Sequence, residues 1–136
     1  MTQELEPKFE KVMIIDDNAI DLYITKRMII KNKFGKNVLE YFSAKKALEY
    51  LKDHQEQINM LPQIIFIDIY MPVMSGFEFM DAFGKLPQKV KHNCKVYISS
   101  STIDENDIKR SNEDRNVTAF QVKPFTKEFL QKINIF

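Results

Sequence analysis

The sequence lacks the residues and segments that mark several classes of protein. Cys94 is the only cysteine among 136 residues, so no disulfide can form within the chain. Three glycines and five prolines are too few for a collagen-like or low-complexity chain. The first ten residues have neither the basic nor the apolar region of a signal peptide. No apolar run approaches the roughly 20 residues that cross a bilayer. We therefore expect a cytoplasmic protein that makes no membrane contact.

Neither sign of charge dominates the chain. Lysine and arginine number 20, aspartate and glutamate 19, and the net charge is +1. A nucleic-acid-binding protein usually carries a basic excess or a basic stripe, so we expect no nucleic-acid partner. The length fits one domain, and 44% hydrophobic residues suffice for one core of ordinary size. We expect residues 1–9 to form an N-terminal extension and residues 10–136 to form a single domain.

Short apolar runs alternate with longer amphipathic segments along the chain. The apolar runs predict strands over residues 12–15, 38–42, 64–67, 96–98 and 120–122. Runs without polar alternation are typical of strands that are buried on both faces. Apolar residues at helical spacing predict helices over residues 19–32, 44–58, 76–86 and 126–135, and the mostly polar residues 104–115 are expected to form an exposed, weakly anchored helix. The alternation predicts an α/β fold, with a parallel sheet covered by helices on both faces.

Residues that can do chemistry stand where the predicted strands end. Asp16 and Asp17 follow the first strand, Asp68 the third, serines 99–101 the fourth and Lys123 the fifth. Each of these features alone is more often a turn, a helix cap or a surface lysine. Ligands of such sheets bind at the carboxyl ends of the strands. If the first and third strands are neighbours, three carboxylates meet at that edge, and the ordered set indicates a functional site.

The expected carboxylate cluster favours magnesium and phosphoryl chemistry. Three close carboxylates raise one another's pKa values, and a hard divalent cation relieves their repulsion. Mg²⁺ prefers oxygen ligands and binds to one or two carboxylates while keeping waters. A carboxylate beside Mg²⁺ can attack phosphorus and form an aspartyl phosphate. Lys123 could then neutralise the charge on the phosphoryl oxygens, and Ser100 could donate a hydrogen bond.

Three segments resemble the receiver domain of two-component response regulators, in particular the single-domain type that includes chemotaxis regulators. Residues 12–18, VMIIDDN, resemble the family's first strand and acidic pair. Residues 67–76, IDIYMPVMSG, resemble its phosphoacceptor strand and D-x-x-M-P-x-x-x-G loop, and residues 122–125, VKPF, resemble its K-P-F ending. The resemblance covers about residues 10–134. It implies a flavodoxin-like, doubly wound (βα)5 sandwich with strand order 2-1-3-4-5.

The resemblance assigns roles to individual residues. Asp68 is the implied phosphoacceptor, and Asp16, Asp17, Asp68 and the backbone carbonyl of Tyr70 are the implied ligands of Mg²⁺. Ser100 is the implied switch hydroxyl and Lys123 the implied partner of a phosphoryl oxygen. The register within serines 99–101 stays open by one position.

Further roles concern switching and the shape of the loops. Phe120 stands at the family's switch aromatic position, although it could simply fill the core. Pro72, Gly76 and Pro124 have implied structural roles, and the Lys123–Pro124 bond is expected to be cis. The large side chain of Tyr70 is expected to shield the aspartyl phosphate from water.

The implied function is a stand-alone phosphorylation switch. A histidine kinase or histidine phosphotransfer protein would donate the phosphoryl group to Asp68 in the presence of Mg²⁺. The chain would be no enzyme beyond catalysing its own phosphorylation and dephosphorylation. We expect no output domain, so a target protein or a second copy of the chain would bind to the face formed by residues 104–115, 120–122 and 126–135.

The sequence departs from the family pattern at two places, and three alternative functions remain open. Ser101 stands where the family often has alanine, and residues 116–119 lack the usual glycine, so Asn116 is expected to be left-handed. A haloacid-dehalogenase-type phosphatase would carry a second aspartate where Tyr70 stands. A flavodoxin-like electron carrier would need a Ser-, Thr- and Gly-rich loop in place of residues 16–18. A binding module that is never phosphorylated would need none of the acidic residues or Lys123.

Overall fold

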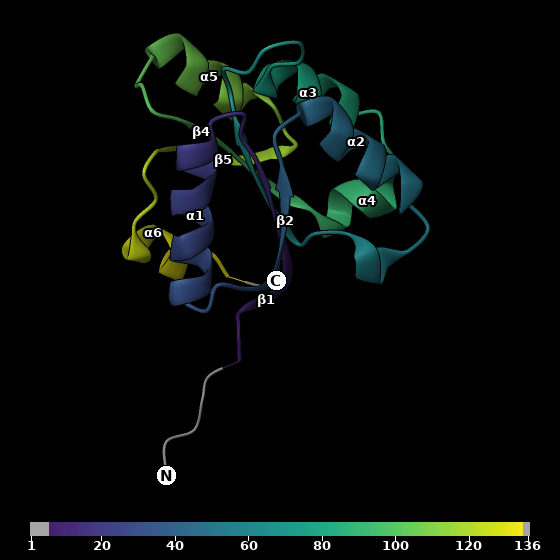
Figure 1. Cartoon of the computed structure of the whole chain (residues 1–136). Coiled ribbons are helices and arrows are strands. Elements are labelled where there is room, and N and C mark those ends of the chain that lie inside the picture. Colours follow the sequence, from purple (N-terminus) through teal and green to yellow (C-terminus); the bar gives the residue numbers. More distant parts are fainter. Residues whose placement is uncertain (1–5, 135–136) are drawn as a thin grey trace.

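The computed structural model describes residues 6–134, and its core is a five-stranded parallel sheet (Figure 1). The strands lie in the order β2-β1-β3-β4-β5, which confirms the expected fold class and strand order. Their bounds are β1 Phe9–Ile15, β2 Gly35–Tyr41, β3 Ile64–Asp68, β4 Lys95–Ser100 and β5 Val117–Val122. Residues 1–5 of the expected extension and residue 135 of the expected last helix lie outside the described residues.

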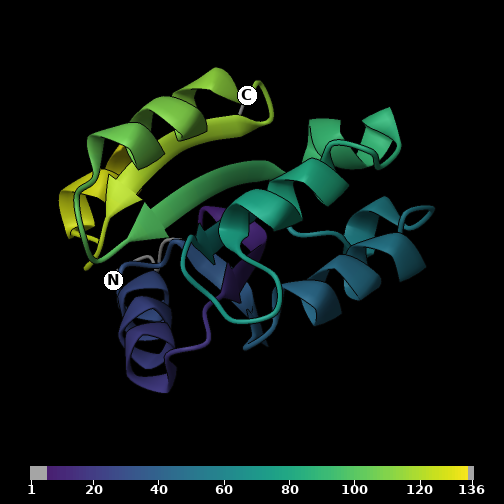
Figure 2. The same ribbon diagram turned by 90° about the horizontal axis from the view of Figure 1, so that it is seen from above.

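Helices cover both faces of the sheet. Their bounds are α1 Ala19–Lys31, α2 Ala44–Asp53, α3 Gly76–Phe83, α4 Gln88–Asn93, α5 Glu105–Glu113 and α6 Lys127–Lys132. Helices α1 and α6 lie on one side of the sheet, and α2, α3 and α4 lie on the other (Figure 1). Helix α5 runs beside the edge strand β5 (Figure 2). Among the described residues, no helix has both the length and the apolar character needed to span a membrane.

Strand geometry divides the core into two layers. Successive side chains of a strand point to opposite faces, so the uninterrupted apolar runs fill both faces. In β1, Val12 and Ile14 pack on the side of α1 and α6, whereas Met13 and Ile15 pack on the side of α2 and α3. The sheet is therefore buried between two helical layers, and only its edges and strand ends reach solvent.

The segment between β3 and β4 differs most from expectation. The predicted helix over residues 76–86 ends at Phe83, and a second helix, α4, follows that the sequence pattern did not predict. Helix α4 contains a single buried side chain, Val90, so its periodicity is too weak to detect. Cys94 follows it and is 3% exposed, and burial raises the pKa of its thiol to about 12.

Three further boundaries or conformations differ from those that the sequence predicts. The helix expected over residues 44–58 ends at Asp53, and a short 3-10 helix, Ile58–Met60, follows separately. Positive φ angles among the described non-glycine residues occur at Lys33 and Val73, so the expectation of a left-handed Asn116 was wrong. Helix α6 is shorter than predicted and ends at Lys132. Its N-cap is Thr126, whose side-chain oxygen accepts a hydrogen bond from the Phe129 N–H.

Candidate functional site

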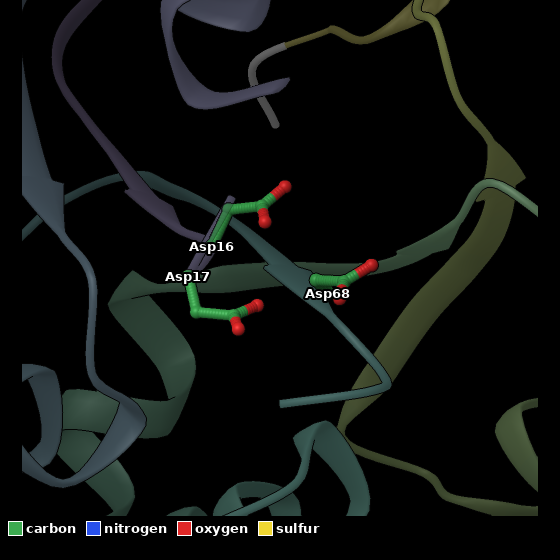
Figure 3. A group of neighbouring side chains, drawn as sticks. All are labelled: Asp16, Asp17 and Asp68. Carbon is green, nitrogen blue, oxygen red and sulfur yellow. The ribbon is translucent and has the colours of Figure 1, made fainter. Parts of the chain in front are cut away.

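Three aspartates meet at the carboxyl edge of the sheet (Figure 3). Asp16 and Asp17 directly follow β1, and Asp68 is the last residue of the neighbouring strand β3. Each carboxylate offers an oxygen that lies within 4.8 Å of the oxygens of the other two. Asp16 and Asp68 are buried, whereas Asp17 is exposed. The pairing of β1 with β3 thus brings together the three carboxylates that the sequence predicts to meet at this edge.

Lys123 joins this cluster from the end of β5. Its ammonium lies 2.8 Å from Asp16 Oδ2 and 3.1 Å from Asp68 Oδ1. It also lies 3.0 Å from Oδ2 of Asp21, a residue of α1 that the sequence analysis did not select. The Lys123 side chain is only 8% exposed, so this lysine is no solvated surface residue.

The surroundings of these groups alter their pKa values. Burial raises the pKa of Asp68 to about 6, and the charges of Asp16 and Asp17 add to the rise, while Lys123 opposes it. Burial lowers the pKa of Lys123, but its hydrogen bonds to Asp16 and Asp21 outweigh burial, and the pKa of Lys123 lies above its usual value. Lys123 is therefore a fixed positive charge at neutral pH.

The donor set fits a hard divalent cation. Three carboxylates carry three negative charges, which one ammonium only partly balances. All the clustered donor atoms are oxygens, which suits Mg²⁺ rather than metals that prefer nitrogen or sulfur. The raised pKa of Asp68 shows that the folded chain alone does not fully stabilise the ionised carboxylate. The acidic cluster could therefore hold Mg²⁺.

Three consecutive serines stand at the end of β4, Ser99 and Ser100 as its last two residues and Ser101 just after it, and their environments differ. Ser99 is the register partner of Asp68, and its hydroxyl donates to the carbonyl of Ile67 at 3.3 Å. The hydroxyl of Ser100 accepts a hydrogen bond from the backbone N–H of Thr102 at 3.2 Å. Ser99 and Ser100 are buried, whereas Ser101 is exposed. The Ser99 hydroxyl is thus bound to the sheet, and the Ser100 hydroxyl faces the loop that follows the strand.

The loop after Asp68 is shaped by a close backbone contact. A Cβ on Gly76 would lie 2.6 Å from the carbonyl oxygen of Asp68, so only glycine fits at the start of α3. The Met74 N–H donates to the carbonyl of Pro72 at 2.8 Å, which closes the turn of this loop. Val73 lies at the tip with a φ of 69°, which is strained for a β-branched residue.

Tyr70 connects this loop to α5. Its side chain is 58% exposed, and its hydroxyl donates a hydrogen bond to the carboxylate of Asp107. That hydrogen bond raises the pKa of Tyr70 to about 12. The ring therefore stands in solvent between the acidic cluster and α5.

The K-P-F segment, residues 123–125, follows β5 and carries Lys123 into the site. The Lys123–Pro124 peptide bond is cis, as the resemblance implied. Phe125 is buried, with its ring centroid 4.7 Å from that of Phe66. Phe120 is half-buried and packs against the core cluster on the side of α2 and α3. Its position is compatible both with a core role and with a switch role.

Comparison with known proteins agrees with this geometry. The family profile described as the response regulator receiver domain matches residues 12–134. A two-component response regulator from Cytophaga hutchinsonii superposes with a TM-score of 0.84 at 27% identity, over 91% of this chain and 92% of that one. A response regulator receiver protein from Dyadobacter fermentans gives 0.79 at 26% identity, over 90% and 96%.

Several curated relatives are longer than this chain. Hybrid signal transduction histidine kinase C of Dictyostelium discoideum is 29% identical over 126 residues, which are 90% of this chain but 10% of the kinase. The two-component response regulator ORR1 of rice is 28% identical over 128 residues, which are 90% of this chain and 53% of that protein. The family match covers nearly all of the described sheet and the whole acidic cluster. This chain therefore belongs to the response regulator receiver domain family of two-component signalling.

Proposed function

We propose that this chain is a Mg²⁺-dependent phosphorylation switch whose phosphoacceptor is Asp68. The observation that carries the proposal is the position of the Asp68 carboxylate. It lies within the three-aspartate cluster and 3.1 Å from the Lys123 ammonium. A nucleophilic carboxylate, a set of oxygen ligands and a fixed positive charge thus converge at one point, as phosphoryl transfer requires.

Each residue of the site has a part in the reaction. Asp16, Asp17, Asp68 and the Tyr70 carbonyl would hold Mg²⁺, which supplies positive charge to the phosphoryl oxygens. An Asp68 carboxylate oxygen forms a bond to phosphorus, and the bond from phosphorus to the donor breaks with its electron pair leaving on the donor. Lys123 pairs with a phosphoryl oxygen, and the Ser100 hydroxyl donates a hydrogen bond to another. Ser100 suits this role better than Ser99, whose hydroxyl already donates to Ile67.

The phosphoryl group would shift a two-state equilibrium. When Ser100 and Lys123 bind to it, the end of β4 and the cis-peptide loop are drawn toward Asp68. Phe120 lies on β5, the strand that leads into the cis-peptide loop, and it would become more buried in the active state. The surface formed by α5, β5 and α6 would then bind a target protein or a second copy of the chain.

The donor would be a histidine kinase or a histidine phosphotransfer protein, and residues 10–136 would act as a single-domain receiver in the cytoplasm. Receiver-like sequence within the Dictyostelium kinase supports such a relay. A Borrelia burgdorferi structure named as a CheX–CheY–BeF3–Mg complex shares the fold at 19% identity, with a TM-score of 0.73, and supports the choice of Mg²⁺. Tyr70 stands where a phosphatase would need its second aspartate, so we propose no turnover of external substrates.

Mass spectrometry after incubation with acetyl phosphate tests the proposal. We expect the wild-type protein to gain about one phosphoryl group with Mg²⁺ present and none without it. The gain should disappear in Asp68→Ala, whereas Asp53→Ala, at the end of α2, should still be phosphorylated. A phosphoryl group retained in Asp68→Ala would refute the assignment of the acceptor.

A further inference from the structure

Asp21 binds to the same lysine as the acidic cluster but stands outside that cluster. Asp21 stands in the first turn of α1, and its Oδ2 lies 3.0 Å from the Lys123 ammonium. The three carboxylates that could share a metal ion are Asp16, Asp17 and Asp68. Asp21 is therefore a carboxylate partner of Lys123 that neither holds the metal nor accepts the phosphoryl group.

The start of α1 fixes Asp21 relative to the metal-binding loop. The side chain of Asn18, the N-cap, accepts a hydrogen bond from the backbone N–H of Asp21 at 3.0 Å. The backbone N–H of Asn18 donates to Asp16 Oδ1, also at 3.0 Å. Asp16 and Asp21 are thus placed by the same turn, and both reach the Lys123 ammonium from α1's side of the site.

Packing alone does not hold the Lys123 ammonium in place. A lysine carries its charge on a flexible four-carbon stem. A cavity of about 170 Å³ lies beside that stem, and Asp21, Ile24, Thr25, Ser101, Lys123 and Pro124 line it. Its three carboxylate contacts, at 2.8, 3.0 and 3.1 Å, therefore help to determine where the ammonium stands.

Those ion pairs change during the proposed reaction. Asp68 would become an acyl phosphate, the mixed anhydride of its carboxyl group with phosphate, and Asp16 would share its charge with Mg²⁺, so two of the three carboxylate partners of Lys123 would be lost or weakened. Asp21 takes no part in these bond changes, and its side chain is 35% exposed, which leaves it a weaker attractor than a phosphoryl group. It can thus retain the ammonium at the site without withdrawing it from the phosphoryl oxygens.

We propose that Asp21 is a positioning residue, which acts through Lys123 and keeps its ammonium beside the phosphoacceptor before and during phosphoryl transfer. The proposal rests on the proposed function of Asp68. It assigns to α1 a share in the reaction that goes beyond the acidic pair preceding this helix.

Rates of phosphorylation by acetyl phosphate with Mg²⁺ provide the first test. We expect Asp21→Ala to be about five- to tenfold slower than wild type, in line with the coupling of contacting charged residues. Asp21→Glu, which keeps the charge, should recover most of the rate. In a Lys123→Met background, where the rate is followed over longer times, Asp21→Ala should change it less than twofold.

The matched control is Glu40→Gln. Glu40 is also 35% exposed and pairs with Lys26 at 2.8 Å, but it stands on β2 and has no contact with Lys123. Its loss removes the same charge and should leave the rate within twofold of wild type. A slowing as large as that of Asp21→Ala would show that net charge alone sets the rate and would overturn the proposal.

Nitrogen-15 NMR of the lysine ammonium groups provides a second readout that a merely structural role of Asp21 would not move. In wild type with Mg²⁺, a held Lys123 ammonium should give a resolved signal that Lys123→Met removes. Asp21→Ala should broaden or remove that signal, and Glu40→Gln should keep it. An unchanged signal in Asp21→Ala would overturn the proposal, as would an equal slowing by Asp21→Ala with and without Lys123. A wild-type protein that is not phosphorylated on Asp68 would instead refute the proposed function.

Discussion

The middle of the sheet and its β5 edge differ in how deeply their residues are buried. Every residue of β3 is buried, and β4 is buried from Val96 onward, whereas every residue of β5 is at least partly exposed. Helix α3 buries five of its eight residues, and α5 buries only Ser111. The same fold thus combines a densely packed half with an edge that few apolar contacts hold.

This difference matches the division of labour that we propose. A site for phosphoryl transfer needs ligands held by rigid elements, and β1 and β3 provide them. A responsive surface needs an element of low local stability, which suits α5 and β5. Two side-chain contacts link α5 to the packed half: the hydroxyl of Tyr70 binds to Asp107, and Arg110 lies over the ring of Phe77 at 4.2 Å.

The strongest test of the comparison removes a large side chain from each region. Phe66 is 1% exposed, and its ring contacts four others, so Phe66→Ala should lower the free energy of unfolding by about 3–5 kcal/mol. Ile108 is a half-buried residue of the mostly exposed α5, and Ile108→Ala should cost less than about 1 kcal/mol. Urea denaturation measures both. Similar losses at the two positions would abolish the distinction.

A pair of glycines at the two ends of α3 tests how tightly the packed half surrounds the site. Gly76→Ala places a methyl group against the Asp68 carbonyl and should cost about 1–3 kcal/mol. At Gly84 the nearest atoms are 3.4 Å away and the φ is −60°, so Gly84→Ala should be neutral or stabilising by up to about 1 kcal/mol. Thermal unfolding of the two variants decides this, and a neutral Gly76→Ala would contradict the close contact.

The packed half also affects the titration of Asp68. Its folded pKa of about 6 exceeds the ordinary value of 3.8, so the folded protein holds its proton more tightly than the unfolded chain. That destabilises the folded state as pH rises from about 4 to 6, and the full cost persists above pH 6. Without Mg²⁺, Asp68→Asn should therefore stabilise the protein by about 1 kcal/mol at pH 7.5, a value that allows for the lost ion pair with Lys123. At pH 4 the same substitution should change the stability very little. Urea unfolding at pH 7.5 and at pH 4 measures the stability change of Asp68→Asn. An equal change at the two pH values would contradict the raised pKa of Asp68.

The smallest expected effect concerns the link between the two regions. If Tyr70 shields the aspartyl phosphate, Tyr70→Ala should shorten its lifetime by a few-fold, which is under about 1 kcal/mol of activation free energy. Tyr23→Ala, on α1, removes a ring that is exposed to nearly the same extent, 59% against 58%, and should leave the lifetime unchanged. Phosphate release after removal of the donor measures both, and equal lifetimes in wild type and Tyr70→Ala would exclude shielding.

The sequence predicted those features that depend on neighbours along the chain. Apolar runs located all five strands, and they are uninterrupted in β1, β3 and β4, because a strand buried on both faces needs no polar alternation. Asp16, Asp17 and Asp68 could be selected because each ends such a run, and a parallel sheet brings those ends to one edge. Lys123 followed from the same rule.

Features that depend on distant contacts were missed. Asp21 stands in the first turn of α1, where acidic residues are common in any helix, so its position alone indicates no functional role. Its partner Lys123 stands 102 residues further along the chain. Helix α4 has too few apolar residues to show a period, and its place depends on burying Val90. Asn116 needed no left-handed conformation, because the turn before β5 closes through the hydrogen bond of its N–H with the Asp114 side chain.

The burial of Cys94 has a practical consequence for measuring motion in this protein. Thiol reagents attack the thiolate, and burial keeps this thiol protonated and covered at neutral pH. A cysteine introduced on the exposed surface of α5, for example Lys109→Cys, would then be the only reactive thiol of the chain. A fluorophore or spin label could be attached there without first removing the native cysteine, so the movement of the loosely packed edge can be followed in an otherwise unaltered molecule.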